Sequence, residues 1–167
     1  MTRPCVAALL LFLCWPMSAQ IRIDLGIAAG RQSYEQPDID PRFLISPELM
    51  LSRGRLALYY SLDQTELSSD DLRRGTLYAS HLGLAYRWPI GSNVAVRAGA
   101  GPSYVRATYL GGKPTWHAQA ELALRTRRLE WFARVRQYDY TLSEFRVAPA
   151  SPDGPALLAG VRVTLHE

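Results

Sequence analysis

The fold is decided by residues 116–137, which read WHAQAELALRTRRLEWFARVRQ. In the first half of this stretch, apolar residues occupy every second position: Trp116, Ala118, Ala120, Leu122 and Leu124. After a basic turn at 126–128 the alternation returns in Leu129, Trp131, Ala133 and Val135. A period of two places successive side chains on opposite faces of a β-strand, whereas an amphipathic helix repeats every three to four residues. The stretch therefore predicts two strands joined by a tight turn.

The same alternation recurs over the rest of the chain. Eight segments carry it, near residues 21–29, 43–52, 56–65, 77–88, 94–105, 116–125, 129–138 and 157–166. Each has about ten residues, the length that a tilted strand needs to cross a bilayer, while strands of soluble domains usually have about five or six. Pro47 and Pro102 lie inside two segments and are expected to weaken pairing there, because proline lacks the N–H of the ladder.

The connections between these segments alternate in length. Short turns are expected at 53–55, 89–93 and 126–128, and long loops at 32–42, 66–75, 106–114 and 139–155. In an up-and-down meander this order puts all long loops at one end and all short turns, with both termini, at the other. No apolar run reaches the roughly 18 residues of a spanning helix, so any membrane crossing must use strands.

The two faces of the expected strands differ sharply in charge. With one parity assigned per strand, the apolar face holds no charged residue, and the opposite face holds twelve. That opposite face also carries many small residues, among them Gly83, Ala85, Gly99 and Gly101, which suit the crowded interior of an eight-stranded barrel better than a water-facing exterior. We therefore predict an all-β fold, an eight-stranded antiparallel up-and-down transmembrane β-barrel with its apolar face toward lipid.

Charged residues on the inner face are expected to neutralise one another. Arginine suits a lumen with little water, since its planar fork can satisfy several acceptors at once. The predicted polar network of the lumen consists of Arg22, Asp24, Glu48, Arg97, Glu121, Arg125, Arg134, Arg136 and Arg162.

Aromatic residues on the apolar face fall into two groups. Those at the long-loop ends are Phe43, Tyr78, Tyr104 and Trp116, and those at the short-turn ends are Tyr86, Trp88 and Trp131. Aromatic rings with a polar atom prefer the boundary between lipid and water. These residues therefore predict two aromatic belts, one at each rim.

The first 19 residues have the pattern of a secretory signal peptide. Arg3 precedes a short apolar stretch of about eleven residues, and Ala19 provides a small residue before the expected cleavage. Both cysteines of the chain, Cys5 and Cys14, lie in this segment, so the barrel domain expected at 20–167 has no thiol chemistry. The net charge of +4 comes without a clustered basic stripe and predicts no nucleic-acid binding.

With these features the chain resembles the small eight-stranded outer-membrane barrels of Gram-negative bacteria, the OmpA/OmpX-like family. The final segment, with Gly160, Val163 and Leu165, resembles the assembly signal of that family, although the chain ends in His166-Glu167 rather than in phenylalanine. The resemblance implies localisation in the cell outer membrane, contact with membrane lipid, and insertion by the barrel-assembly machinery. Basic loop residues suggest pairing with lipopolysaccharide, with solvated loop charge as the alternative: Arg42, Arg73, Arg74, Arg106, Lys113 and Arg146. A monomer is expected.

Catalytic chemistry has few candidates in this sequence. Some barrels of this type edit lipid A and need a base that faces the lipid, but the alternation points His81 into the lumen and its neighbour Ser80 outward. His117 lies on the inner face, where it could pair with Glu121, although a hydrogen-bonded lumen histidine is the default. The three histidines of the segment after residue 19 show no metal-ligand spacing, and no cofactor is expected.

The function expected from the sequence is that of a non-enzymatic outer-membrane barrel with a filled polar lumen, which acts in envelope structure or in surface interaction through its loops. A diffusion pore is not expected, because eight strands leave no open channel. One alternative is a lipid A-modifying enzyme on the same barrel. The other is a secreted, soluble lipocalin-like binder with its apolar face turned inward.

Overall fold

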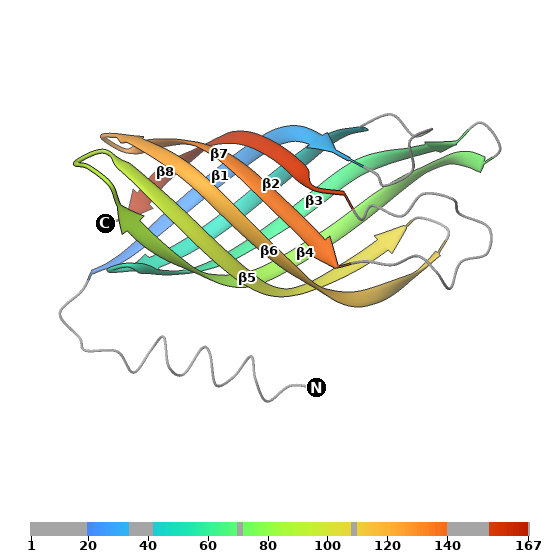
Figure 1. Cartoon of the computed structure of the whole chain (residues 1–167), viewed down its shortest axis with the longest axis horizontal. Helices are drawn as coiled ribbons and strands as arrows, with labels where there is room; N and C mark the ends of the chain where they lie inside the picture. The colour runs from blue at the N-terminus through green and yellow to red at the C-terminus, as the bar shows by residue number, and fades with distance from the viewer. Residues whose placement is uncertain (1–19, 34–41, 70–71, 108–109, 140–153, 167) are drawn as a thin grey trace.

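The computed structural model describes residues 20–33, 42–69, 72–107, 110–139 and 154–166 (Figure 1). The expected signal peptide and its cleavage site lie outside the described residues. The strands are β1 (Ile21–Gln32), β2 (Arg42–Arg53), β3 (Leu56–Ser69), β4 (Leu72–Pro89), β5 (Val94–Ala107), β6 (Leu110–Thr126), β7 (Leu129–Asp139) and β8 (Ala156–His166). No helix within the described ranges is long and apolar enough to cross a membrane.

The eight strands form a closed antiparallel barrel in sequence order. Each strand pairs with the next, and β1 closes the barrel against β8 through a register that includes Leu25↔Val163 and Ala29↔Ala159. In Figure 1 the strands tilt around the long axis, and β1 starts at the same end where β8 finishes. Fold class, strand number and up-and-down topology are confirmed.

Two of the loops expected from the sequence are wrong. Residues 66–75 and 106–114 largely continue the strands, because β3 and β4 pair as far as Ser69↔Leu72 and β5 and β6 as far as Ala107↔Leu110. The alternation of apolar and polar residues fades there, yet the backbone ladder continues. The physical reason is that a two-stranded ribbon beyond the membrane meets water on both faces and needs no apolar side.

The two prolines coincide with gaps in the ladder. Pairing of β2 with β3 passes from Ile45↔Gln64 directly to Glu48↔Ser61, across Pro47. Pairing of β4 with β5 passes from His81↔Ser103 to Leu84↔Ala100, across Pro102. Each gap fits the missing donor of proline, and the local weakening expected from the sequence is confirmed.

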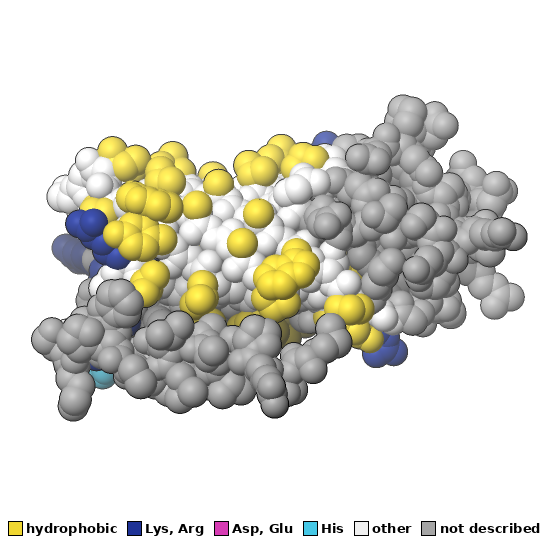
Figure 2. Space-filling view, turned by 60° about the horizontal axis from the view of Figure 1, so that its bottom comes forward, with side chains coloured by type: hydrophobic (Ala, Val, Ile, Leu, Met, Phe, Trp, Pro, Cys, Tyr) yellow, Lys and Arg dark blue, Asp and Glu magenta, His cyan; other side chains and the backbone are white. Residues whose placement is uncertain are grey.

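The barrel carries its apolar side chains outside and its charges inside. Leu122 on the outer face of β6 is 54% exposed, whereas the neighbouring Glu121 on the inner face is 4% exposed. Figure 2 shows yellow hydrophobic side chains over the visible barrel wall, with dark blue basic groups at its ends. This arrangement is the reverse of that in a water-soluble barrel. It matches a transmembrane barrel, whose outer surface contacts the hydrocarbon of the bilayer.

Candidate functional site: the polar lumen

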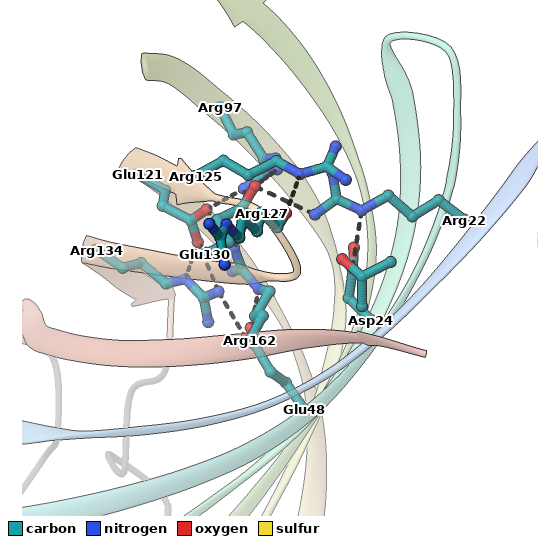
Figure 3. Close-up of polar contacts among 11 residues, drawn as sticks. Arg22, Asp24, Glu48, Arg97, Glu121, Arg125, Arg127, Glu130, Arg134 and Arg162 are labelled. Atoms are coloured by element: carbon teal, nitrogen blue, oxygen red, sulfur yellow. Dashed lines mark hydrogen bonds and ion pairs between the residues drawn. The ribbon is translucent and has the colours of Figure 1, made fainter. Parts of the chain in front are cut away.

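The lumen near the short turns is filled by an ion-pair cluster of three glutamates and three arginines, shown in Figure 3. We call it the charge cluster. Its members come from five strands, and all are buried: Glu48, Arg97, Glu121, Glu130, Arg134 and Arg162. Period-two alternation brings them together, since each occupies an inward position of its strand at a similar height.

Glu121 is the acceptor at the centre of the charge cluster. Its Oε1 accepts from Arg97 Nη1 and from Arg162 Nη1, each at 2.7 Å, and its Oε2 accepts from Arg134 Nη2 at 2.7 Å. Arg162 Nη2 also bonds Glu121 Oε2. One carboxylate therefore accepts hydrogen bonds from three guanidinium groups on three strands.

Glu130 and Glu48 complete the charge cluster. Glu130 accepts a bidentate pair from Arg97 at 2.6 and 2.7 Å and a further bond from Arg162 at 2.8 Å. Glu48 pairs with Arg162 and, at 2.6 Å, with Arg134. The guanidinium groups of Arg162 and Arg134 also lie over the Phe132 ring. The distance from the ring centroid is 3.9 Å to Arg162 Cζ and 4.7 Å to Arg134 Cζ. Planar arginine is the side chain suited to such multiple contacts.

A second group, the histidine relay, lies toward the long-loop end. Tyr59 Oη is 2.6 Å from His117 Nε2, and His117 Nδ1 is 2.7 Å from Ser103 Oγ. Ser103 Oγ is also 2.7 Å from His81 Nδ1, and His81 Nε2 is 3.2 Å from Asp63 Oδ2. These five buried side chains form one continuous hydrogen-bonded chain across β3, β4, β5 and β6.

The hydrogen bonds of the described residues place the predicted lumen residues in more than one group. Arg136 joins the histidine relay, since its Nη1 donates to both Asp63 oxygens at 2.8 Å and its Nε donates to Gln119 at 3.0 Å. The suggested pairing of His117 with Glu121 is wrong. The Glu121 carboxylate accepts hydrogen bonds from arginines, and the His117 ring bonds Tyr59 and Ser103.

Three predicted residues lie at the short-turn mouth of the lumen. Arg22 Nε donates to Asp24 Oδ1 at 2.8 Å, and Asp24 also accepts from Thr164 at 2.7 Å. Arg22 further pairs with Glu130 at 3.3 Å. Arg125 donates to the Arg127 carbonyl at 3.1 Å.

Sequence reasoning missed several members of both groups. Glu130 and Asp63 lie on the charged face of their strands but are not among the predicted network residues, and neither are Tyr59 and Ser103. Their inward parity was the available signal. What the sequence could not show is which inward residues share a height, because this depends on the stagger between strands that are distant in the chain.

The aromatic residues lie at the two rims, on the outer face. At the long-loop end Phe43 and Trp116 are 63% and 65% exposed, with Tyr78 and Tyr104 also outward. At the short-turn end Trp88 and Trp131 are exposed. Tyr86 packs against Trp88, with ring centroids 4.7 Å apart, and accepts a hydrogen bond from Arg55 at 3.3 Å.

The histidine relay contains the residue types of a serine hydrolase triad, but these residues are not accessible to a substrate as the triad of a hydrolase is. Ser103, His81 and Asp63 are all buried inside the barrel, and Ser103 also bonds a second histidine. The outward Ser80 bonds the Tyr104 carbonyl at 3.4 Å. Among the described residues, no group of three or more His, Cys, Asp or Glu side chains could hold a metal ion.

No family model matches the chain, and no curated protein sequence matches it. Solved structures do match. Neisserial surface protein A superposes with a TM-score of 0.61 at 16% identity, over 87% of this chain and 98% of that one. Ail of Yersinia pestis in a phospholipid nanodisc gives 0.53 at 13% identity, over 88% and 99%. The outer membrane enzyme PagL gives 0.53 at 15% identity, over 84% and 98%. The fold is thereby shown: the chain is a small eight-stranded antiparallel β-barrel, similar in fold to these outer-membrane proteins.

Proposed function

We propose that this protein is a non-enzymatic outer-membrane barrel, with a role in envelope structure or in surface interaction through its extracellular connections. The observation that carries the proposal is the charge cluster. Six interlocked side chains cross the lumen and leave their charges mutually paired. A lumen closed in this way stiffens the wall and does not serve as a diffusion path.

The proposal includes lipopolysaccharide as a lipid partner. Arg31 on β1 and Arg106 on β5 are exposed at the long-loop end, on the outward parity of their strands. Guanidinium groups bind phosphate with two parallel hydrogen bonds, and lipid A presents phosphates at this level of the membrane. The proposal also includes insertion by the barrel-assembly machinery and a monomeric state, since a closed barrel offers no free strand edge for pairing with a second copy.

A lipid A-modifying enzyme is the second candidate. The fold likeness to PagL and the Ser103-His81-Asp63 relay favour it. Burial of all three side chains in the lumen disfavours it, because an acyl chain approaches a barrel from the lipid side. The lipocalin-like alternative requires the apolar face inside, and here that face points outward.

Mass spectrometry of lipid A separates the two candidates. Lipid A from cells that lack the protein, from cells that express it and from cells with Ser103→Ala would be compared. We expect the same acyl pattern in all three. An acyl chain lost or gained only with the unsubstituted protein would contradict the proposal. Membrane fractionation of the same cells, with heat-modifiable migration on gels, checks that a folded barrel is present.

A further inference from the structure

The short-turn end of the barrel carries a concentration of arginine that was not apparent along the sequence. Seven arginines from four strands and two turns meet there: Arg22, Arg53, Arg55, Arg87, Arg125, Arg127 and Arg128. We call this set the basic rim. Figure 2 shows dark blue side chains at this end, on the left of the view. The members come from four separate stretches of the chain, at 22, 53–55, 87 and 125–128, and the closure of the barrel brings these stretches together.

Among the described residues, Asp24 and Glu130 pair with one member of the basic rim, Arg22, and so neutralise the rim only in part. None of the described residues in the turns 53–55, 89–93 and 126–128 is acidic. The acids just inside the mouth are already used, since Asp24 is bound by Arg22 and Thr164, and Glu130 by Arg97 and Arg162. Within the described part of the chain, the seven arginines of the basic rim therefore outnumber the carboxylates that pair with it.

Arg87 shows this excess most clearly. It stands directly opposite Arg97 in the β4–β5 register, so two like charges face each other across the ladder. Arg97 is held by Glu121 and Glu130, while the buried Nε of Arg87 has no hydrogen-bond partner within the described part of the chain. An anion at the mouth would relieve this repulsion.

The basic rim lies at the level of the short-turn aromatic belt. Arg55 donates to the outward-facing Tyr86, whose ring packs against Trp88. Aromatic belts mark the depth of lipid headgroups, so the exposed guanidinium groups of the rim meet phosphates when the barrel is in a bilayer. The turns are also held in place, because the Arg87 amide bonds the Arg55 carbonyl at 2.8 Å and the Thr164 amide bonds the Arg128 carbonyl at 2.8 Å.

We propose that the basic rim binds anionic glycerophospholipid headgroups of the periplasmic leaflet. Short turns of such barrels face the periplasm. A basic side chain near an anionic membrane surface favours association by roughly fivefold, and arginine adds bidentate contacts with phosphate. The exposed members Arg55, Arg127 and Arg128 would contact lipid directly, while Arg22, Arg87 and Arg125 add positive potential at the mouth. This site is separate from the proposed role of the extracellular connections.

Tryptophan quenching by brominated lipid tests the proposal. Protein purified without residues 1–19, and thus without Trp15, would carry Trp116→Phe, which leaves Trp88 and Trp131 as reporters of the short-turn belt. It would be placed in phosphatidylcholine vesicles that contain either brominated phosphatidylglycerol or brominated phosphatidylcholine. We expect phosphatidylglycerol to be preferred about threefold or more around these reporters, and the preference to fall in 1 M NaCl, because salt screens exposed charges. Equal quenching by the two lipids would overturn the proposal.

A matched pair of variants locates the effect. Arg55→Gln with Arg128→Gln should remove most of the preference. Arg31→Gln with Arg106→Gln makes the same charge change at the long-loop end and should leave the preference unchanged. Heat-modifiable migration checks that both variants are folded. The salt dependence of the lipid preference is measured on protein with an unsubstituted basic rim, so that measurement does not depend on the folding of either variant. If isolated peptidoglycan captured the protein through Arg55 and Arg128 while the vesicles showed no lipid preference, the lipid assignment would be wrong.

Discussion

At the residue scale, the stability of the barrel depends on buried carboxylates, each of which accepts hydrogen bonds from several arginines. Glu121 is buried and accepts from Arg97, Arg134 and Arg162. Charges buried in this way are costly to desolvate, and the cost is offset only while every partner is present. Removal of one carboxylate leaves three guanidinium groups with too few acceptors, whereas replacement of a whole buried network with apolar residues is often tolerated.

Glu121→Gln is therefore expected to lower the free energy of unfolding by about 3–5 kcal/mol, the usual cost of leaving a buried charge uncompensated. Urea unfolding of the barrel in lipid vesicles measures it. Glu66→Gln is the control, because Glu66 is exposed near the long-loop end and its loss should change the unfolding free energy by less than about 0.5 kcal/mol. Equal effects of the two substitutions would mean that the charge cluster does not stabilise the fold.

At the element scale, the seam between β1 and β8 closes the barrel and has little room. Gly30 lies opposite Leu158 in this seam, and a methyl group at Gly30 would collide with the Leu157 carbonyl. The neighbouring atoms are backbone, which cannot rotate away as a side chain could. A Cβ at position 30 therefore requires the backbone of β8 to shift away from β1.

Gly30→Ala is expected to destabilise the closed barrel by about 1–3 kcal/mol, the typical cost of overpacking. A larger fraction of the protein should then migrate as the unfolded form on unheated gels. Gly91→Ala provides the comparison, since no atom lies within 4 Å of a methyl group at that turn position. A seam that accepted alanine without loss of the folded band would contradict the register described for β1 and β8.

At the scale of the whole molecule, the barrel is organised inside out. Its apolar side chains face lipid, and its buried interior is charged. The average composition, with 48% hydrophobic residues, resembles that of a soluble protein because it combines two opposite faces. The effect of an outer-face substitution on the free energy of unfolding should therefore reflect contact with hydrocarbon rather than with water.

Leu122→Arg tests this organisation. Leu122 is exposed on the outer face of β6, one outward position inside the short-turn aromatic belt, where an arginine on the lipid face costs up to about 2–4 kcal/mol. Ile90→Arg, in the exposed β4–β5 turn, should change the unfolding free energy by no more than about 1 kcal/mol, because the turn lies outside the hydrocarbon. Urea titration in phosphatidylcholine vesicles gives both values. A neutral effect of Leu122→Arg would show that this face does not contact lipid.

The sequence by itself determined the strands and their two faces. A period of two is a local property, so residues 116–137 alone show that Glu121, Arg134 and Arg136 share one side of a hairpin. The order of short and long connections then determined the meander. The hairpin extensions beyond residues 66 and 106 escaped this reasoning, because a ladder in water needs no apolar pattern to mark it.

Only the tertiary structure decided which inward residues meet. Closure of β1 on β8 and the stagger of the strands place Arg162 beside Glu48 and Glu121, and Arg136 beside Asp63 in a different group. The same closure gathers arginines from separate turns into the basic rim. Alternation shows the face on which a side chain lies, but its height along the barrel depends on the shear of the closed sheet, which is a property of all eight strands together.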